Sequence, residues 1–115
     1  MHKKIREHLL RKIFLPRRYN IEELYRTEWS HPFERLMRNR LVFGAYRYGR
    51  LHEANKPVYD RVAGIQRKLE VYKDTHNTEM LVDIANLAML EFEEGCHPKK
   101  TFRSVDDQAH TPTKE

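Results

Sequence analysis

The segment from residue 79 to residue 92 constrains the fold most strongly, because as a helix it is apolar on nearly every side. It runs Glu-Met-Leu-Val-Asp-Ile-Ala-Asn-Leu-Ala-Met-Leu-Glu-Phe. A helix that is apolar all round is buried at the centre of its domain. Three of its polar residues, Glu79, Asp83 and Asn86, are spaced i, i+4 and i+7, which places them on one face. Acidic side chains on a buried helix require a cationic partner.

Two interpretations of this polar face stay open. In the first, the two carboxylates hold a hard cation such as Mg²⁺, and the asparagine amide oxygen joins them or holds a water. Glu70, on the helix expected to face this one, is the nearest further ligand. In the second, the acids form ion pairs with Arg67, Lys68 or an arginine of the preceding helix, and the asparagine hydrogen-bonds to backbone. A cleft beside the carboxylates favours the first interpretation.

Proline, glycine and capping residues divide the first half of the chain into three further helices. A basic amphipathic helix is expected over residues 2–14, ahead of a helix-stopping proline. Asn20, with a glutamate three residues later, caps a short helix that ends near Trp29. Ser30-His31-Pro32 opens a third helix, which runs from residue 33 to residue 48.

The second half of the chain predicts a helical hairpin. Pro57 begins one helix, in which apolar residues follow the 4-3-4-3 spacing of a bundle seam; these are Val58, Val62, Ile65, Leu69 and Tyr72. A second helix spans residues 78–94 and ends at Gly95. The connector between them is so short that the two helices must be antiparallel neighbours.

These elements predict an all-α fold, a small bundle of about five helices with an antiparallel central hairpin and an irregular C-terminal tail. Its expected parts are a basic N-terminal helical region (residues 1–29), a bundle core (30–97) and a polar tail (98–115). A chain of 115 residues is long enough to form one domain without disulfides.

Charge is distributed unevenly along the chain. Residues 1–50 hold 13 Lys and Arg against 5 Asp and Glu, whereas residues 51–115 hold 9 against 12. The first half therefore packs on the second or faces an anion such as phosphate. The single cysteine, Cys96, forms no internal disulfide, and no 18-residue apolar run or signal-type segment occurs. We expect a cytoplasmic protein without a membrane span.

A second cluster with chemical potential is the end of the helix expected over residues 33–48. Tyr46, Arg47, Tyr48 and Arg50 combine aromatic faces with guanidinium groups, and Lys56 follows closely. Such a set stacks a base and pairs with a phosphate. The alternative is a helix end with core tyrosines and solvated arginines. The Gly-Ala pair at residues 44–45 allows another helix to approach closely.

Two of these segments resemble a known family. Val-Phe-Gly-Ala-Tyr-Arg-Tyr-Gly (42–49) and Glu-Met-Leu-Val-Asp-Ile-Ala-Asn-Leu-Ala (79–88) are similar to segments of the dATP/dGTP diphosphohydrolase-like proteins of phages and bacteria. That family is similar in turn to the MazG-like all-α nucleotide pyrophosphohydrolases. The resemblance implies an oligomeric helical bundle that binds Mg²⁺ through helix carboxylates. It also implies cleavage of a nucleoside triphosphate to the monophosphate and pyrophosphate, in a bacterial cell or a phage-infected host.

The resemblance assigns roles to particular residues. Asp83 matches the acidic position of the last metal-binding helix, but Glu79 precedes it by four residues instead of the family's three. The facing helix offers the single carboxylate of Glu70 where the family carries Glu-Glu-x-x-Glu. The implied metal ligands are Glu79, Asp83 and Glu70. The implied substrate-binding residues are Asn86, Arg47, Arg50, Lys56 and Tyr48. No catalytic residue is assigned.

The sequence therefore predicts a MazG-like nucleotide-binding protein, with Mg²⁺-dependent (d)NTP pyrophosphohydrolase activity as its expected chemistry and a homo-oligomer as its expected assembly. The alternative is a non-enzymatic helical adaptor or inhibitor protein of the phage accessory type, which binds a protein partner. Nucleic-acid binding has less support, because no recognised reading motif accompanies the basic residues.

Overall fold

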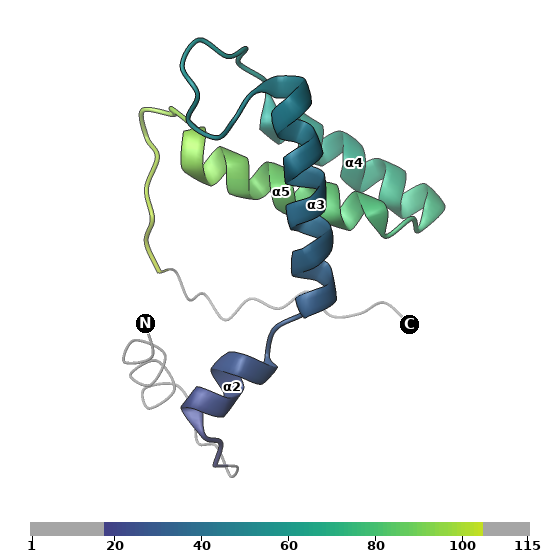
Figure 1. Cartoon of the computed structure of the whole chain (residues 1–115), viewed down its shortest axis with the longest axis vertical. Helices are drawn as coiled ribbons and strands as arrows, with labels where there is room; N and C mark the ends of the chain where they lie inside the picture. The colour runs from purple at the N-terminus through teal and green to yellow at the C-terminus, as the bar shows by residue number, and fades with distance from the viewer. Residues whose placement is uncertain (1–17, 105–115) are drawn as a thin grey trace.

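The computed structural model describes residues 18–104 and is all-helical over that range, as predicted. Its helices are α2 (Ile21–Thr27), α3 (His31–Tyr48), α4 (Arg61–Thr75) and α5 (Glu79–Glu94) (Figure 1). The helix expected over residues 2–14 and the end of the polar tail lie outside the described residues.

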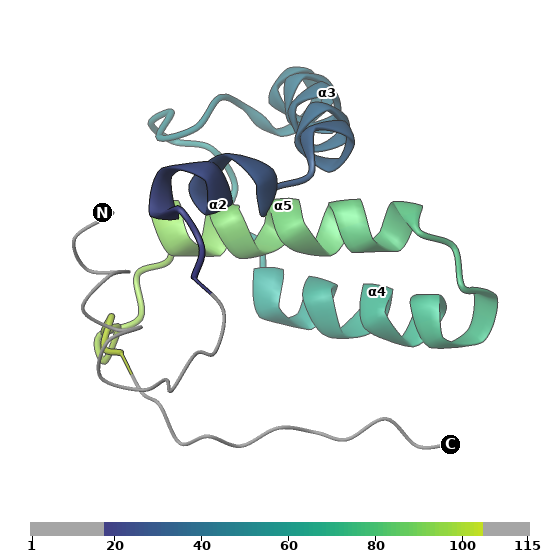
Figure 2. The ribbon, with the colours of Figure 1, turned by 90° about the horizontal axis from the view of Figure 1, so that it is seen from below.

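Helix α5 occupies the centre of the bundle. Helices α3 and α4 pack against α5 and not against each other. Figure 2 shows α5 between α3 on one side and α4 on the other, with α3 crossing it steeply. The α3–α4 loop (residues 49–60) passes around the C-terminal end of α5 to connect the two outer layers (Figure 1). The central position predicted from the all-round apolar pattern is confirmed.

Local capping explains where the helices begin. Asn20 Oδ1 accepts hydrogen bonds from the backbone N–H groups of Glu22 and Glu23, and Ser30 Oγ accepts one from Phe33. Helix α4 begins at Arg61 instead of Pro57, because Asp60 Oδ1 accepts the Ala63 N–H and fixes the first turn there. Side-chain caps satisfy donors that the first helical turn leaves free.

The later start of α4 corrects the predicted seam. Val58 lies in the loop and is 97% exposed, so it contributes nothing to helix packing. The antiparallel hairpin of α4 and α5 is as predicted, and its connector turns through His76, whose φ of 56° is left-handed. Asn77 Oδ1 accepts the backbone N–H of Glu79 and so supports the start of α5.

The buried core of the described residues is small. Val82, Asn86 and Gly64 are buried, and a methyl group added at Gly64 would touch Leu87 of α5 at 3.4 Å. At Gly44 an added methyl group would meet nothing within 4 Å, so the helix expected to approach closely there is not found among the described residues. No helix in residues 18–104 is long and apolar enough to cross a membrane.

Candidate functional site

The Asp83 carboxylate ties all three packed helices together. Arg40 of α3 places Nε 2.6 Å from Asp83 Oδ1, and Lys68 of α4 places Nζ 3.2 Å from Asp83 Oδ2. The Asp83 side chain is 12% exposed. Each of its oxygens therefore accepts from a cation of a different helix. An arginine of the preceding helix and Lys68 are the partners that the ion-pair interpretation expected; Arg67 is not among them.

The other two residues of the polar face have partners on α3. Arg40 Nη2 lies 3.0 Å from Glu79 Oε1, so one guanidinium holds both acids. Asn86 Nδ2 donates to the backbone oxygen of Met37 at 3.1 Å. Because a carbonyl oxygen can only accept, this bond fixes the orientation of the amide. Asn86 Oδ1 is left buried, without a hydrogen-bond partner in the described part of the chain.

The described structure does not bring the three predicted metal ligands together. Glu70 lies on the exposed side of α4, where its nearest cation is Lys73 at 3.5 Å. No group of three or more His, Cys, Asp or Glu residues within 18–104 is arranged to hold a metal ion. A Mg²⁺ ion at Asp83 would have to displace Arg40 or Lys68. The donors therefore fit a metal poorly, and metal binding by Glu79, Asp83 and Glu70 stays a prediction.

A cleft of about 1020 Å³ lies beside this polar face. Helices α3, α4 and α5 and the α3–α4 loop all contribute to its walls. The predicted substrate-binding residues all line it, and so does one predicted metal ligand: these are Arg47, Tyr48, Arg50, Lys56, Asn86 and Asp83. Glu79 and Glu70 are outside its lining.

The lining of the cleft is strongly cationic. It contains seven Arg and Lys side chains against the two acids Asp60 and Asp83. Four of the cations are already paired: Arg40 and Lys68 with Asp83, and Lys56 and Arg61 with Glu94. Arg47, Arg50 and Arg67 have no carboxylate within ion-pair distance in the described range. Within residues 18–104, three guanidinium groups of the cleft thus have no acidic partner.

Two tyrosines form an aromatic corner in the same cleft. The rings of Tyr48 and Tyr59 meet edge to face, with centroids 5.4 Å apart and planes at 75°. Both side chains line the cleft and are about half exposed. An edge-to-face pair leaves ring faces available for stacking.

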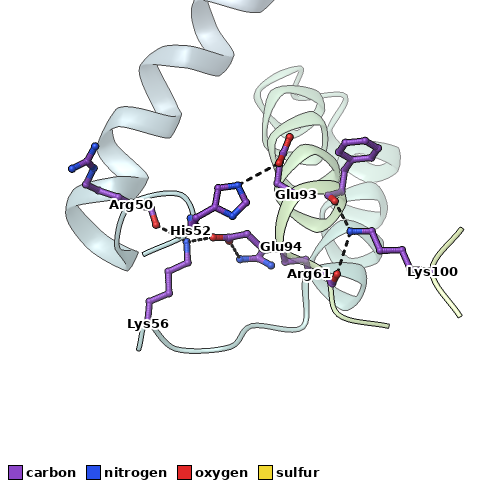
Figure 3. Close-up of polar contacts among 9 residues, drawn as sticks. Arg50, His52, Lys56, Arg61, Glu93, Glu94 and Lys100 are labelled. Carbon is purple, nitrogen blue, oxygen red and sulfur yellow. Dashed lines mark hydrogen bonds and ion pairs between the residues drawn. The ribbon is translucent and has the colours of Figure 1, made fainter. Parts of the chain in front are cut away.

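A second carboxylate that is largely shielded from solvent, Glu94 at the end of α5, was missed by the sequence analysis. Its Oε2 accepts from Lys56 Nζ at 2.7 Å and from the His52 backbone N–H at 2.7 Å, and its Oε1 lies 2.6 Å from Arg61 Nη2 (Figure 3). The Glu94 side chain is 10% exposed. The hydrogen bond from Lys56 holds the pKa of the Glu94 carboxyl below its usual value, with smaller contributions from His52 and Arg61, against the opposing effect of burial.

A signal for this site was present in the sequence. The last turns of α5 carry Glu91, Glu93 and Glu94 and no basic residue. Carboxylates at a helix C-terminus are opposed by the helix dipole. Acids at that position therefore indicate cationic partners elsewhere in the chain. Lys100 supplies a further cation, whose ammonium donates to the backbone oxygens of Phe92 and Gly95 (Figure 3).

Comparisons of the chain with protein-family models, with curated proteins and with solved structures find no match. The resemblance to the MazG-like proteins therefore depends on the two sequence segments alone.

Proposed function

We propose that the protein binds a nucleotide, with the phosphate groups held in the cleft between α3, α4 and α5. The observation that carries this proposal is the set of three cleft arginines, Arg47, Arg50 and Arg67, which no described carboxylate neutralises. Guanidinium groups bind phosphate oxygens in pairs of parallel hydrogen bonds. Collected in one concave site, they favour a ligand with several negative charges.

The size and the aromatic content of the cleft favour a nucleotide over a bare anion. Its volume, about 1020 Å³, is at the upper end of the range for small-molecule sites. Tyr48 and Tyr59 provide planar surfaces on which a base stacks. A ligand with both a polyphosphate and an aromatic ring would use both parts of the lining. A nucleoside triphosphate meets that description.

The proposal concerns binding, and pyrophosphate release remains a prediction from the sequence. Both oxygens of Asp83 accept from cations, so this carboxylate is not placed to activate a water. The phosphate charge is met by arginine in the proposed complex. Mg²⁺ is not needed for the ligand to bind.

Calorimetric titration with dATP and with inorganic tripolyphosphate tests the proposal directly. We expect both to bind in the presence of EDTA, to raise the melting temperature, and to bind more weakly as the salt concentration rises. Arg47→Gln and Arg50→Gln should each weaken binding about tenfold, the loss of one charge-assisted hydrogen bond.

Arg38→Gln is the matched control, because Arg38 lies on the same helix but outside the cleft, where it pairs with Glu34 at 3.7 Å. This variant should bind dATP as the unchanged protein does. If neither dATP nor tripolyphosphate binds the unchanged protein, with or without Mg²⁺, the proposal is wrong. Release of pyrophosphate in the Mg²⁺ arm would support the predicted hydrolase activity.

A second candidate function, protein binding, is favoured by the exposed hydrophobic side chains of α3. These are Leu36, Val42, Phe43 and Tyr46; Phe43 is 69% exposed and Tyr46 is 89% exposed. Val42 and Phe43 also line the cleft, so a partner on this surface would lie at the edge of the proposed nucleotide site. Contiguous apolar patches of this kind mark interaction surfaces. We favour a second copy of the chain as the occupant, because Val82 is the only buried hydrophobic residue among residues 18–104 and a second copy would cover the exposed side chains of α3.

Light scattering after size exclusion shows whether the protein is a monomer or a dimer. A dimer that Tyr46→Glu converts to a monomer supports this surface as the interface. A monomeric unchanged protein at micromolar concentration overturns the homo-oligomer prediction. Nucleotide binding by that monomer would leave the first proposal intact.

A further inference from the structure

The α3–α4 loop is held in an unfavourable backbone conformation. His52 and Asn55 have φ values of 62° and 64°, and Gly49 has 98°. Residues other than glycine adopt this left-handed region at an energetic cost, and they persist there only where surrounding contacts hold them. Two such residues within four positions therefore indicate that the loop is fixed from outside.

Glu94 supplies the external contacts. It accepts the backbone N–H of His52 itself, and it binds Lys56 on the other side of Asn55. Lys56 in turn donates to the backbone oxygen of Arg50 at 2.8 Å. The three contacts therefore connect the Glu94 carboxylate, through Lys56, to the backbone of Arg50, whose guanidinium lines the cleft (Figure 3).

The ammonium of Lys56 still has a donor to offer. An ammonium group has three N–H bonds, and two of those of Lys56 are directed at Glu94 and at the Arg50 backbone. The Lys56 side chain is 14% exposed and lines the cleft. Glu94 is absent from the cleft lining. The carboxylate thus places cleft donors without facing the ligand.

We infer that Glu94 is a positioning residue for the anion site: it fixes the α3–α4 loop so that Arg50 and Lys56 are presented to the cleft. This inference depends on the proposed function, because the ligand is the phosphate of the nucleotide. It predicts that an acidic residue strengthens the binding of an anion. That sign is opposite to the expectation from charge alone.

The opposite signs make Glu94→Gln a decisive variant. If Glu94 acted only through its charge, its removal would make the site more positive and would tighten binding of tripolyphosphate. If it acts by positioning, its removal frees the loop and weakens binding. We expect tripolyphosphate and dATP to bind Glu94→Gln about tenfold more weakly than the unchanged protein.

Glu91→Gln is the matched control. Glu91 lies one turn earlier on α5, outside the cleft lining, and its side chain forms no hydrogen bond or ion pair with the loop among residues 18–104. Its neutralisation removes the same charge from the same helix end, so tripolyphosphate should bind this variant with unchanged or slightly higher affinity. Equal weakening in both variants would show that the loss is not specific to the loop contacts of Glu94, and it would overturn the inference.

Hydrogen exchange tests the positioning without any ligand. In Glu94→Gln, the His52 amide should lose protection while the central amides of α4 and α5 keep theirs, which also shows that the variant is folded. Unchanged protection of His52 overturns the inference, and so does tripolyphosphate binding that is unchanged or tighter. If the unchanged protein binds no phosphate at all but the His52 result holds, the proposed function fails and the role of Glu94 in fixing the loop stands.

Discussion

Two carboxylates of α5, those of Asp83 and Glu94, both form ion pairs with two cations but have different structural roles. Asp83 and Glu94 are about equally buried, and each is held by two cations. The partners of Asp83, Arg40 and Lys68, come from the middle of two helices. Those of Glu94 come from the α3–α4 loop and from Arg61, the first residue of α4. Asp83 therefore joins the middles of the helices, whereas Glu94 fixes the loop together with the first residue of α4.

The comparison shows that the mechanical role of an ion pair depends on what its partners are attached to. An ion pair to a cation on a packed helix holds that whole helix against its neighbour. An ion pair to a cation on a loop holds only a few residues, which can adopt other, solvated conformations when the contact is lost. The first arrangement contributes mainly to global stability, and the second to local order.

The largest effect is expected for Asp83→Ala. It leaves Arg40 and Lys68 without their shared acceptor and removes the polar tie between α3, α5 and α4. We expect the free energy of unfolding to fall by about 2 kcal/mol, below the full value for a buried pair because both cations are partly solvated. Urea denaturation followed by circular dichroism measures it. A change below about 0.5 kcal/mol would remove the distinction between the two carboxylates.

A smaller loss of global stability is expected for Glu94→Gln. Lys56 and Arg61 are only 14% and 12% exposed. However, glutamine can still accept a hydrogen bond from one of them, and the loop can rearrange without separating the packed helices. The unfolding free energy should therefore fall by less than half as much as for Asp83→Ala. The same urea experiment gives both values. A larger loss for Glu94→Gln than for Asp83→Ala would reverse the assignment of roles.

Acid should release the loop before it unfolds the helices. The pKa of Glu94 is lowered in the folded protein, so the stabilisation by this carboxylate is complete above its unfolded value of about 4.3 and is lost as the pH falls through the folded value. We expect the protection factor of the His52 amide to fall below about pH 4 while helical circular dichroism persists. In Glu94→Gln the protection should be low at every pH, and a matching acid transition in that variant would contradict the assignment.

The smallest effect is expected for Glu79→Gln. Glu79 is about half exposed and shares Arg40 with the better-buried Asp83. Since an exposed ion pair contributes little, the unfolding free energy should change by less than about 0.5 kcal/mol. Thermal and urea denaturation would detect a larger change. Such a change would show that the ion pair between Arg40 and Asp83 depends on Glu79.

The sequence alone determined the helices and the position of α5. Helix starts and short turns depend on interactions within a few residues, so a short stretch of sequence predicts them. Examples are the side-chain caps at Asn20 and Ser30 and the brief connector after Thr75. The all-round apolar pattern of α5 required burial on more than one side, which placed it at the centre. The predicted start of α4 was wrong by four residues, because the helix begins after the capping side chain of Asp60 and not at Pro57.

Only the tertiary structure decided which cations meet which acids. Arg40 is 43 residues from Asp83, and Arg61 is 33 residues from Glu94. The chain has 22 Lys and Arg residues, and nothing in their spacing selects these partners. The pairing follows from the angle at which α3 crosses α5 and from the path of the α3–α4 loop around the end of α5. Both depend on packing between distant segments, which a local pattern does not encode.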